Sequence, residues 1–122
     1  MRMNRFANTR NHFQGTDKKV LTVCSAGLLR SPTMALVLAQ DPWNFNTRSC
    51  GFNKEYALIV LEPILVYWAD EIVAANEEAY DAVMEFDINN KLVHNFNIPD
   101  MFPYRAPELV DIIKDRALTL WG

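Results

Sequence analysis

The sequence contains only two cysteines, Cys24 and Cys50, among its 122 residues. Two cysteines cannot build the disulfide framework that supports small secreted domains. A chain of this length can bury an ordinary hydrophobic core without covalent cross-links. We therefore expect a globular protein in a reducing compartment, and the cytoplasm is the location that fits.

Long apolar runs are also missing. The longest, residues 57–69, is interrupted by Glu62 and Pro63 and is shorter than the ~20 residues that span a bilayer. The first residues contain no apolar segment of the kind found in secretory signals. We expect no membrane association.

Patterns of metal ligands are absent as well. His12 and His94 have no cysteine, histidine or carboxylate partner at the spacing of metal ligands. We interpret both histidines as structural and expect neither a metal nor another cofactor.

The net charge of −3 conceals an uneven distribution. Residues 1–20 hold five basic side chains and one acidic side chain, whereas residues 53–122 hold five basic and thirteen acidic ones. A basic segment could contact nucleic acid or an acidic partner. Because asparagine, glutamine and glycine accompany the charges, we favour a solvated leader with little structure over residues 1–18. We expect one domain over residues 19–122 and no nucleic-acid partner.

Strand and helix patterns alternate along this domain. Strands are predicted over residues 19–24, 47–51, 71–75 and 91–96, and helices over residues 31–40, 63–69, 76–86 and 106–120. This alternation predicts an α/β fold of three layers, α/β/α, around a four-stranded parallel sheet. Ligands of such sheets bind beyond the carboxyl ends of the strands, and Cys24 lies at such an end.

The most informative motif begins at Cys24 and ends at Ser31, between an apolar strand and the start of a helix. A loop that closes on a helix N-terminus offers backbone amides to an anion, and the same field favours thiolate over thiol. Arg30 supplies a planar guanidinium that can hold two phosphate oxygens. The predicted phosphate-binding residues are Ser25, Ala26, Gly27, Leu28, Leu29, Arg30 and Ser31.

This pattern indicates phosphate-ester chemistry with Cys24 as nucleophile and Ser31 as a donor to the departing sulfur. The competing interpretation is a buried, inert Cys24 beside an Arg30 that forms a surface salt bridge.

A general acid must protonate the leaving oxygen of a phosphomonoester, and three aspartates compete for this role. Asp41 follows the first helix, whose far end lies ~15 Å from the loop, and Asp70 precedes a strand. Asp100 follows the last strand and is therefore expected at the carboxyl edge, beside Cys24. We select Asp100 as the acid, with Phe102 and Tyr104 as walls of the substrate cleft.

The motif resembles the phosphate loop of the low-molecular-weight protein tyrosine phosphatases, in particular their short bacterial and phage branch. Three further stretches agree in order, at residues 48–51, 68–73 and 98–110, so the resemblance covers residues 19–120. It implies the fold of that family and phosphotyrosine as the substrate class. The sequence alone leaves open whether the phosphomonoester substrate is a phosphorylated protein or a small aryl or sugar phosphate.

Some positions depart from the family. Gly27 and Leu29 stand where the family usually carries an asparagine that locks the loop and a second cysteine. Ser49 resembles a serine that braces the loop, but its usual asparagine partner is missing. Cys50 could approach Cys24, although an inert buried thiol is the interpretation that we favour.

The sequence leaves two alternative functions open. One is an arsenate-reductase-like redox enzyme, which would need Cys50 to relay a disulfide. The other is a phosphate-binding regulatory module without turnover, which the glycine at position 27 would suit.

Overall fold

The structure is a computed structural model that describes residues 8–9, 18–25, 30–99 and 106–122. Its strands form one sheet in the order β1-β3-β2-β4-β5. Four of them run parallel: β2 (Lys19–Cys24), β3 (Asn46–Gly51), β4 (Glu71–Ala74) and β5 (Leu92–Asn95). The predicted four-stranded parallel sheet is therefore confirmed.

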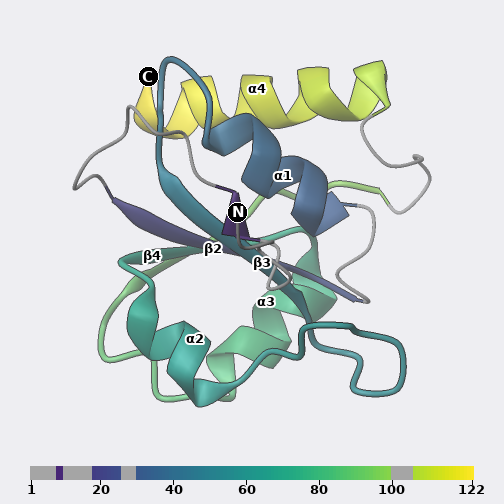
Figure 1. The fold of residues 1–122 in the computed structure, drawn as a ribbon, viewed down its shortest axis with the longest axis vertical. Coiled ribbons are helices and arrows are strands. Elements are labelled where there is room, and N and C mark those ends of the chain that lie inside the picture. Colours follow the sequence, from purple (N-terminus) through teal and green to yellow (C-terminus); the bar gives the residue numbers. More distant parts are fainter. Residues whose placement is uncertain (1–7, 10–17, 26–29, 100–105) are drawn as a thin grey trace, which may run out of the picture.

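Helices cover both faces of the sheet (Figure 1). One face is covered by α1 (Arg30–Leu38) and α4 (Pro107–Trp121), and the other by α2 (Pro63–Trp68) and α3 (Glu77–Met84). This arrangement confirms the three predicted layers. The element ends lie within two residues of those predicted, because the local signals are strong. Asn76, for example, caps α3 by accepting a hydrogen bond from the Ala79 amide at 2.9 Å.

The sheet has a fifth strand that the sequence did not predict. β1 (Asn8–Thr9) pairs antiparallel with the outer edge of β3. Lys18 is also held in place, because its carbonyl accepts a hydrogen bond from the Asn46 amide at 2.9 Å. The expectation of a leader with little structure over residues 1–18 is therefore wrong for these three residues. A two-residue strand is too short to produce a hydrophobic pattern in the sequence.

The alternation of side chains along β2 divides the core between the two faces of the sheet. Val20 and Cys24 pack with α1 and α4, whereas Leu21 and Val23 pack with α2 and α3. α4 contributes Leu109, Ile113 and Ala117 to its side of the core, and all three are fully buried.

The buried stripe of α4 ends before the helix does, since Leu120 is 39% exposed. Among the described residues, no helix has the length and apolar character needed to cross a membrane.

Candidate active site

Cys24 is the last residue of β2 and lies against the first turn of α1. Its Sγ atom lies 3.3 Å from Oγ of Ser31, the second residue of that helix. The exposed amides of a helix N-terminus carry partial positive charge, which favours the binding of an anion at this position. The structure thus brings together the predicted nucleophile and the predicted donor.

Ser31 is fully buried and is held in a defined position. Its Oγ atom donates a hydrogen bond to the carbonyl of Cys50 at 3.1 Å, and its own carbonyl accepts one from Thr22 Oγ1 at 2.8 Å. Sequence reasoning missed Thr22, because a threonine in a strand of β-branched residues looks like an ordinary strand former. Its position two residues before Cys24 could have identified it, because residues two apart in a strand point to the same face of the sheet.

Arg30 is the first residue of α1 and only 3% exposed, so the interpretation of Arg30 as a surface salt-bridge residue is wrong. Its Nη1 atom donates a hydrogen bond to the carbonyl of Ile98 at 2.9 Å. Ile98 follows β5 and is itself bonded to the carbonyl of Ala75 at 2.7 Å, beyond the carboxyl end of β4. The guanidinium is therefore fixed at the carboxyl edge of the sheet, the same edge as Cys24.

The chain entering the loop is fixed by backbone hydrogen bonds from the neighbouring segment. The amide of Phe52 donates to the carbonyl of Cys24 at 3.0 Å, and the amide of Asn53 donates to the carbonyl of Ser25 at 2.8 Å. These bonds continue the pairing of β2 with β3 past the ends of both strands. Of the predicted phosphate-binding residues, Ser25, Arg30 and Ser31 are described. Ala26, Gly27, Leu28 and Leu29 lie outside the described residues.

The rejected aspartates occupy turns at the opposite, amino edge of the sheet. Asp41 lies in the turn after α1 and accepts a hydrogen bond from Asn44 Nδ2 at 2.5 Å. Asp70 precedes β4 and accepts one from the amide of Lys19 at 2.9 Å. The interpretation of Asp41 as a turn residue is confirmed, whereas Asp70 joins the start of β4 to the start of β2. The selected acid, Asp100, and the predicted cleft walls Phe102 and Tyr104 lie outside the described residues.

The two cysteines point to opposite faces of the sheet. Cys50 pairs in register with Val23 and packs among the α2 and α3 residues, whereas Cys24 packs on the α1 and α4 side. Burial raises the pKa of the Cys50 thiol far above its ordinary value, and the nearby Cys24 adds to the effect. A neutral thiol on the far face is a poor partner for a disulfide with Cys24. The interpretation of Cys50 as a buried thiol is confirmed.

The brace that the resemblance suggested for Ser49 is not seen among the described residues. The side-chain oxygen of Ser49 is buried and makes no hydrogen bond with any described residue. The hydrogen bond described on this side of the site joins the Ser31 hydroxyl to the Cys50 carbonyl.

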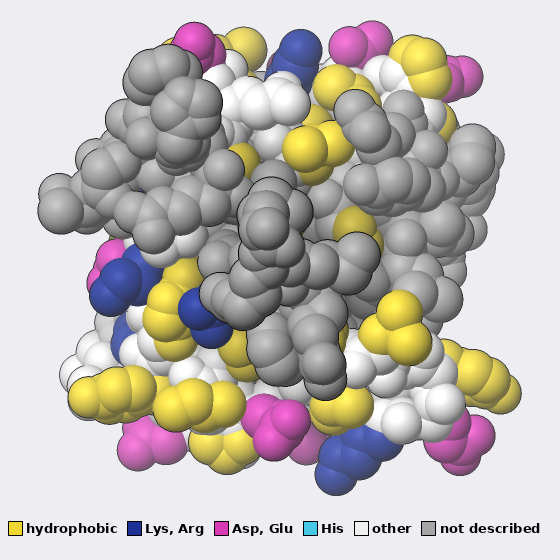
Figure 2. Space-filling model, in the orientation of Figure 1, with side chains coloured by type: hydrophobic (Ala, Val, Ile, Leu, Met, Phe, Trp, Pro, Cys, Tyr) yellow, Lys and Arg dark blue, Asp and Glu magenta, His cyan; other side chains and the backbone are white. Residues whose placement is uncertain are grey.

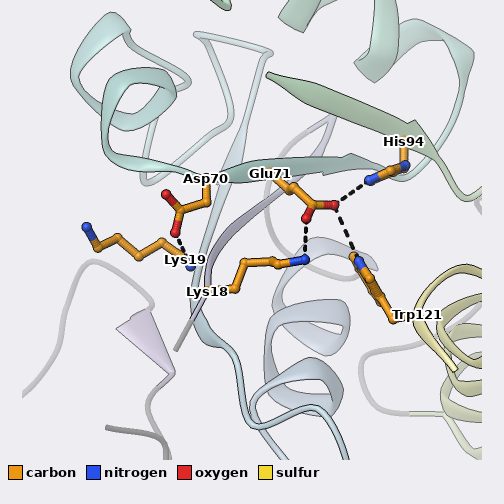
Figure 3. A network of polar contacts seen from close by, with 6 residues as sticks. All are labelled: Lys18, Lys19, Asp70, Glu71, His94 and Trp121. Carbon is orange, nitrogen blue, oxygen red and sulfur yellow. Dashed lines mark hydrogen bonds and ion pairs between the residues drawn. The ribbon is translucent and has the colours of Figure 1, made fainter. Parts of the chain in front are cut away.

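A second polar cluster lies away from Cys24, and Figure 3 shows its side chains converging on Glu71. The carboxylate of Glu71 accepts a hydrogen bond from His94 Nε2 at 2.7 Å and from Trp121 Nε1 at 3.3 Å, and it pairs with Lys18. Burial alone would raise the pKa of Glu71, but these donors outweigh burial and hold the pKa below its ordinary value. His94 therefore has a structural role, as expected, whereas His12 lies outside the described residues.

No protein-family model matches the sequence, and neither does any curated protein. Solved structures do match the fold. Wzb from Vibrio vulnificus, solved in complex with benzylphosphonate, is 19% identical, with a TM-score of 0.67 over 84% of this chain and 96% of that chain. The tyrosine phosphatase Wzb from Escherichia coli K30, in complex with phosphate, is 14% identical, with a TM-score of 0.66 over 86% of this chain and 96% of that chain.

A low-molecular-weight phosphotyrosine phosphatase from Vibrio cholerae O395 is similar to the same extent. It is 19% identical, with a TM-score of 0.64 over 84% of this chain and 94% of that chain. The chain therefore has the fold of the low-molecular-weight tyrosine phosphatases, as the resemblance drawn from its sequence implied.

Proposed function

We propose that this protein is a phosphoric monoester hydrolase of the tyrosine phosphatase type, with Cys24 as its nucleophile. The observation that carries the proposal is the position of the Cys24 thiol, 3.3 Å from the Ser31 hydroxyl in the first turn of α1. Arg30 lies at the same edge of the same sheet. A thiol, a helix N-terminus and a guanidinium are the groups that a phosphocysteine mechanism needs together.

The first step is attack of the Cys24 thiolate on phosphorus, which forms an S–P bond and breaks the bond from phosphorus to the leaving oxygen. Arg30 and the amides at the start of α1 stabilise the negative charge on the equatorial oxygens. In the second step, water attacks the phosphocysteine and the sulfur departs as thiolate. The Ser31 hydroxyl lies between Cys24 Sγ and the Cys50 carbonyl, to which it donates in this structure. As negative charge returns to the sulfur, the hydroxyl would turn to donate a hydrogen bond to it and keep its proton.

Asp100 is the proposed general acid. It follows Ile98 by two residues, and the Ile98 carbonyl is bonded to Arg30. This short separation in sequence from Ile98 supports Asp100 for the role. Asp100 would protonate the leaving oxygen and then activate the attacking water. Asp41 and Asp70 are engaged at the other edge of the sheet.

Phosphotyrosine or a similar aryl phosphate is the proposed substrate, with Phe102 and Tyr104 as walls of the cleft. The support comes from the fold neighbours, which include a phosphotyrosine phosphatase and a complex with benzylphosphonate, a phosphonate that carries an aromatic ring. The cytoplasm is the proposed location, since two cysteines cannot build a disulfide framework and fit a reducing compartment.

The arsenate-reductase-like alternative is disfavoured by Cys50, because its thiol lies on the other face of the sheet. A phosphate-binding module without turnover would use the same groups, so it differs from the phosphatase only in whether hydrolysis occurs.

Hydrolysis of p-nitrophenyl phosphate tests the proposal, with Cys24→Ser as the test variant and Cys50→Ala as its control. We expect turnover in the wild type and in Cys50→Ala, and none in Cys24→Ser, which should still bind phosphate. Tight phosphate binding without hydrolysis by the wild type would favour the binding module. Full activity in Cys24→Ser would refute the assignment of the nucleophile.

A further inference from the structure

A hollow lies beside α2, on the face of the sheet opposite Cys24. It has a volume of about 330 Å³ and is lined by Arg48, Leu58, Ile59, Val60, Glu62, Ile64 and Leu65. Five of these seven side chains are aliphatic, and two carry charge. The volume falls at the lower end of the range of about 300–1,000 Å³ that is usual for sites of small organic ligands.

The hollow is separate from the candidate active site. Val60 is bridged to Gly51, and Gly51 pairs with Cys24. Since neighbouring strands lie about 4.8 Å apart, the segment at Val60 is roughly two such spacings, or 10 Å, from the backbone of Cys24. The segment is fixed by hydrogen bonds between Gly51 and both Ile59 and Leu61, each 2.9 Å long.

The aliphatic wall of the hollow is unusually exposed. Leu58 is 83% exposed and Ile64 is 69% exposed. Tyr67, on the same short helix, is 81% exposed. Figure 2 shows hydrophobic side chains along the lower part of the molecule, where α2 lies. Two exposed aliphatic side chains that line one hollow, unlike a single exposed leucine, indicate a surface that receives a ligand or partner.

Arg48 gives the hollow a cationic wall. Its guanidinium carbon lies 4.6 Å from the centre of the Trp68 ring, which supports one face of the guanidinium. Its Nε atom is buried and has no hydrogen-bond partner among the described residues. Nor does Arg48 form an ion pair with any of them. The half-buried guanidinium of Arg48 therefore has hydrogen-bonding capacity that the described residues leave unused.

We propose that the hollow binds a small amphipathic carboxylate, such as a medium-chain fatty acid or an aryl carboxylate. The carboxylate accepts hydrogen bonds from the Arg48 guanidinium, and the hydrocarbon part covers Leu58 and Ile64. The carboxylate matches the charge of Arg48, which forms no ion pair with the described residues. The hydrocarbon part matches the exposed aliphatic side chains of Leu58 and Ile64. The inference does not rest on the proposed phosphatase function, since none of these side chains belongs to that site.

Glu62 provides an internal test of this electrostatic argument. It lines the same hollow and is exposed at the first turn of α2, where its side chain makes no capping hydrogen bond. Its charge opposes an anionic ligand, and solvent screens the effect. Removing the charge should therefore tighten the binding of a carboxylate and leave the binding of a neutral molecule unchanged.

The experiment is a titration of the full chain with octanoate and, in parallel, with neutral 1-octanol. Binding is followed by tryptophan fluorescence and by amide shifts of residues 58–65 in ¹H–¹⁵N NMR spectra. The Trp68→Phe variant lacks the indole that stacks on the Arg48 guanidinium. The part of the fluorescence change that this variant loses therefore comes from Trp68. We expect saturable octanoate binding, weaker by roughly tenfold or more in Arg48→Met, since a hydrogen bond to a charged group is lost. Binding should tighten roughly two- to fivefold in Glu62→Gln.

Three outcomes would overturn the inference. They are no saturable shift at residues 58–65, equal affinity for octanoate and 1-octanol, and a concentration-dependent dimer that buries this face and is abolished by Ile64→Asp. Thermal unfolding establishes that Arg48→Met is folded. If it does not fold, Arg48→Lys and Glu62→Gln carry the test, because Lys retains the charge and should retain part of the octanoate binding.

Discussion

The two buried serines near Cys24 make opposite predictions when their hydroxyls are removed. Ser31 Oγ contacts Cys24 Sγ at 3.3 Å and donates to the Cys50 carbonyl at 3.1 Å. Ser49 Oγ is equally buried but has no hydrogen-bond partner among the described residues. Ser31→Ala should therefore destabilise the fold, whereas Ser49→Ala should leave stability unchanged or raise it, because burial of an unpaired hydroxyl is unfavourable.

The size of the first effect follows from the two hydrogen bonds. Each typically contributes about 0.5–1.5 kcal/mol, so Ser31→Ala should cost roughly 1–3 kcal/mol of unfolding free energy. An unfolding entropy of about 2.1 cal/mol/K per residue, over 122 residues, gives about 0.26 kcal/mol/K for the chain. The melting temperature should then fall by roughly 4–12 °C.

Thermal unfolding followed by circular dichroism measures this difference, and urea titration supplies the free energies. Turnover of p-nitrophenyl phosphate should also respond. Loss of a hydrogen bond to a charged sulfur costs about 1.5–3 kcal/mol, which corresponds to roughly 10–150-fold in rate. Equal melting temperatures for the two variants, or a larger loss in Ser49→Ala, would refute the assignment of Ser31 as the residue that braces the site.

Three further predictions follow from the same contacts. Arg30→Lys should lower kcat/KM for p-nitrophenyl phosphate by at least about tenfold, because an ammonium cannot hold two oxygens as a guanidinium does; near-normal kinetics would make Arg30 structural. Asp100→Asn should slow turnover of phosphotyrosine by roughly 10²–10⁴-fold, whereas Asp41→Asn should hardly change it, and the reverse pattern would overturn the choice of acid. Its hydrogen-bond donors lower the pKa of Glu71 in the folded state. Glu71 therefore stabilises the fold at pH values above its pKa in the unfolded chain, about 4.3, and this contribution is lost as the pH falls through its pKa in the folded state. Urea titrations below about pH 5 should show a steeper loss of stability in the wild type than in Glu71→Gln, and parallel curves would contradict the role of the network.

The sheet and its helices were predictable because their signals are local. The apolar strand at residues 19–24, the proline that starts α2 and the asparagine that caps α3 each determine an element within a few residues. The order of these elements then placed Cys24 at the carboxyl edge of the sheet. β1 was not predictable, because its two residues gain their structure only from pairing with β3.

The contacts that complete the candidate site were harder to predict, because they join residues far apart in the sequence. The bond from Arg30 to the Ile98 carbonyl spans 68 positions, and the cluster around Glu71 brings together Lys18, His94 and Trp121. The orientation of Cys50 could have been derived from register alone. Its pairing with Val23 rather than Cys24 places the two thiols on opposite faces.

The central claim is that phosphate is transferred to Cys24, and capture of the phosphoenzyme tests it most directly. Wild-type protein mixed rapidly with p-nitrophenyl phosphate is quenched in acid, digested and analysed by mass spectrometry. We predict one phosphoryl group on the peptide that contains Cys24, increased in Ser31→Ala because the departure of the sulfur is slowed. Turnover without a phosphoryl group on Cys24, or with the group on any other residue, would contradict the mechanism.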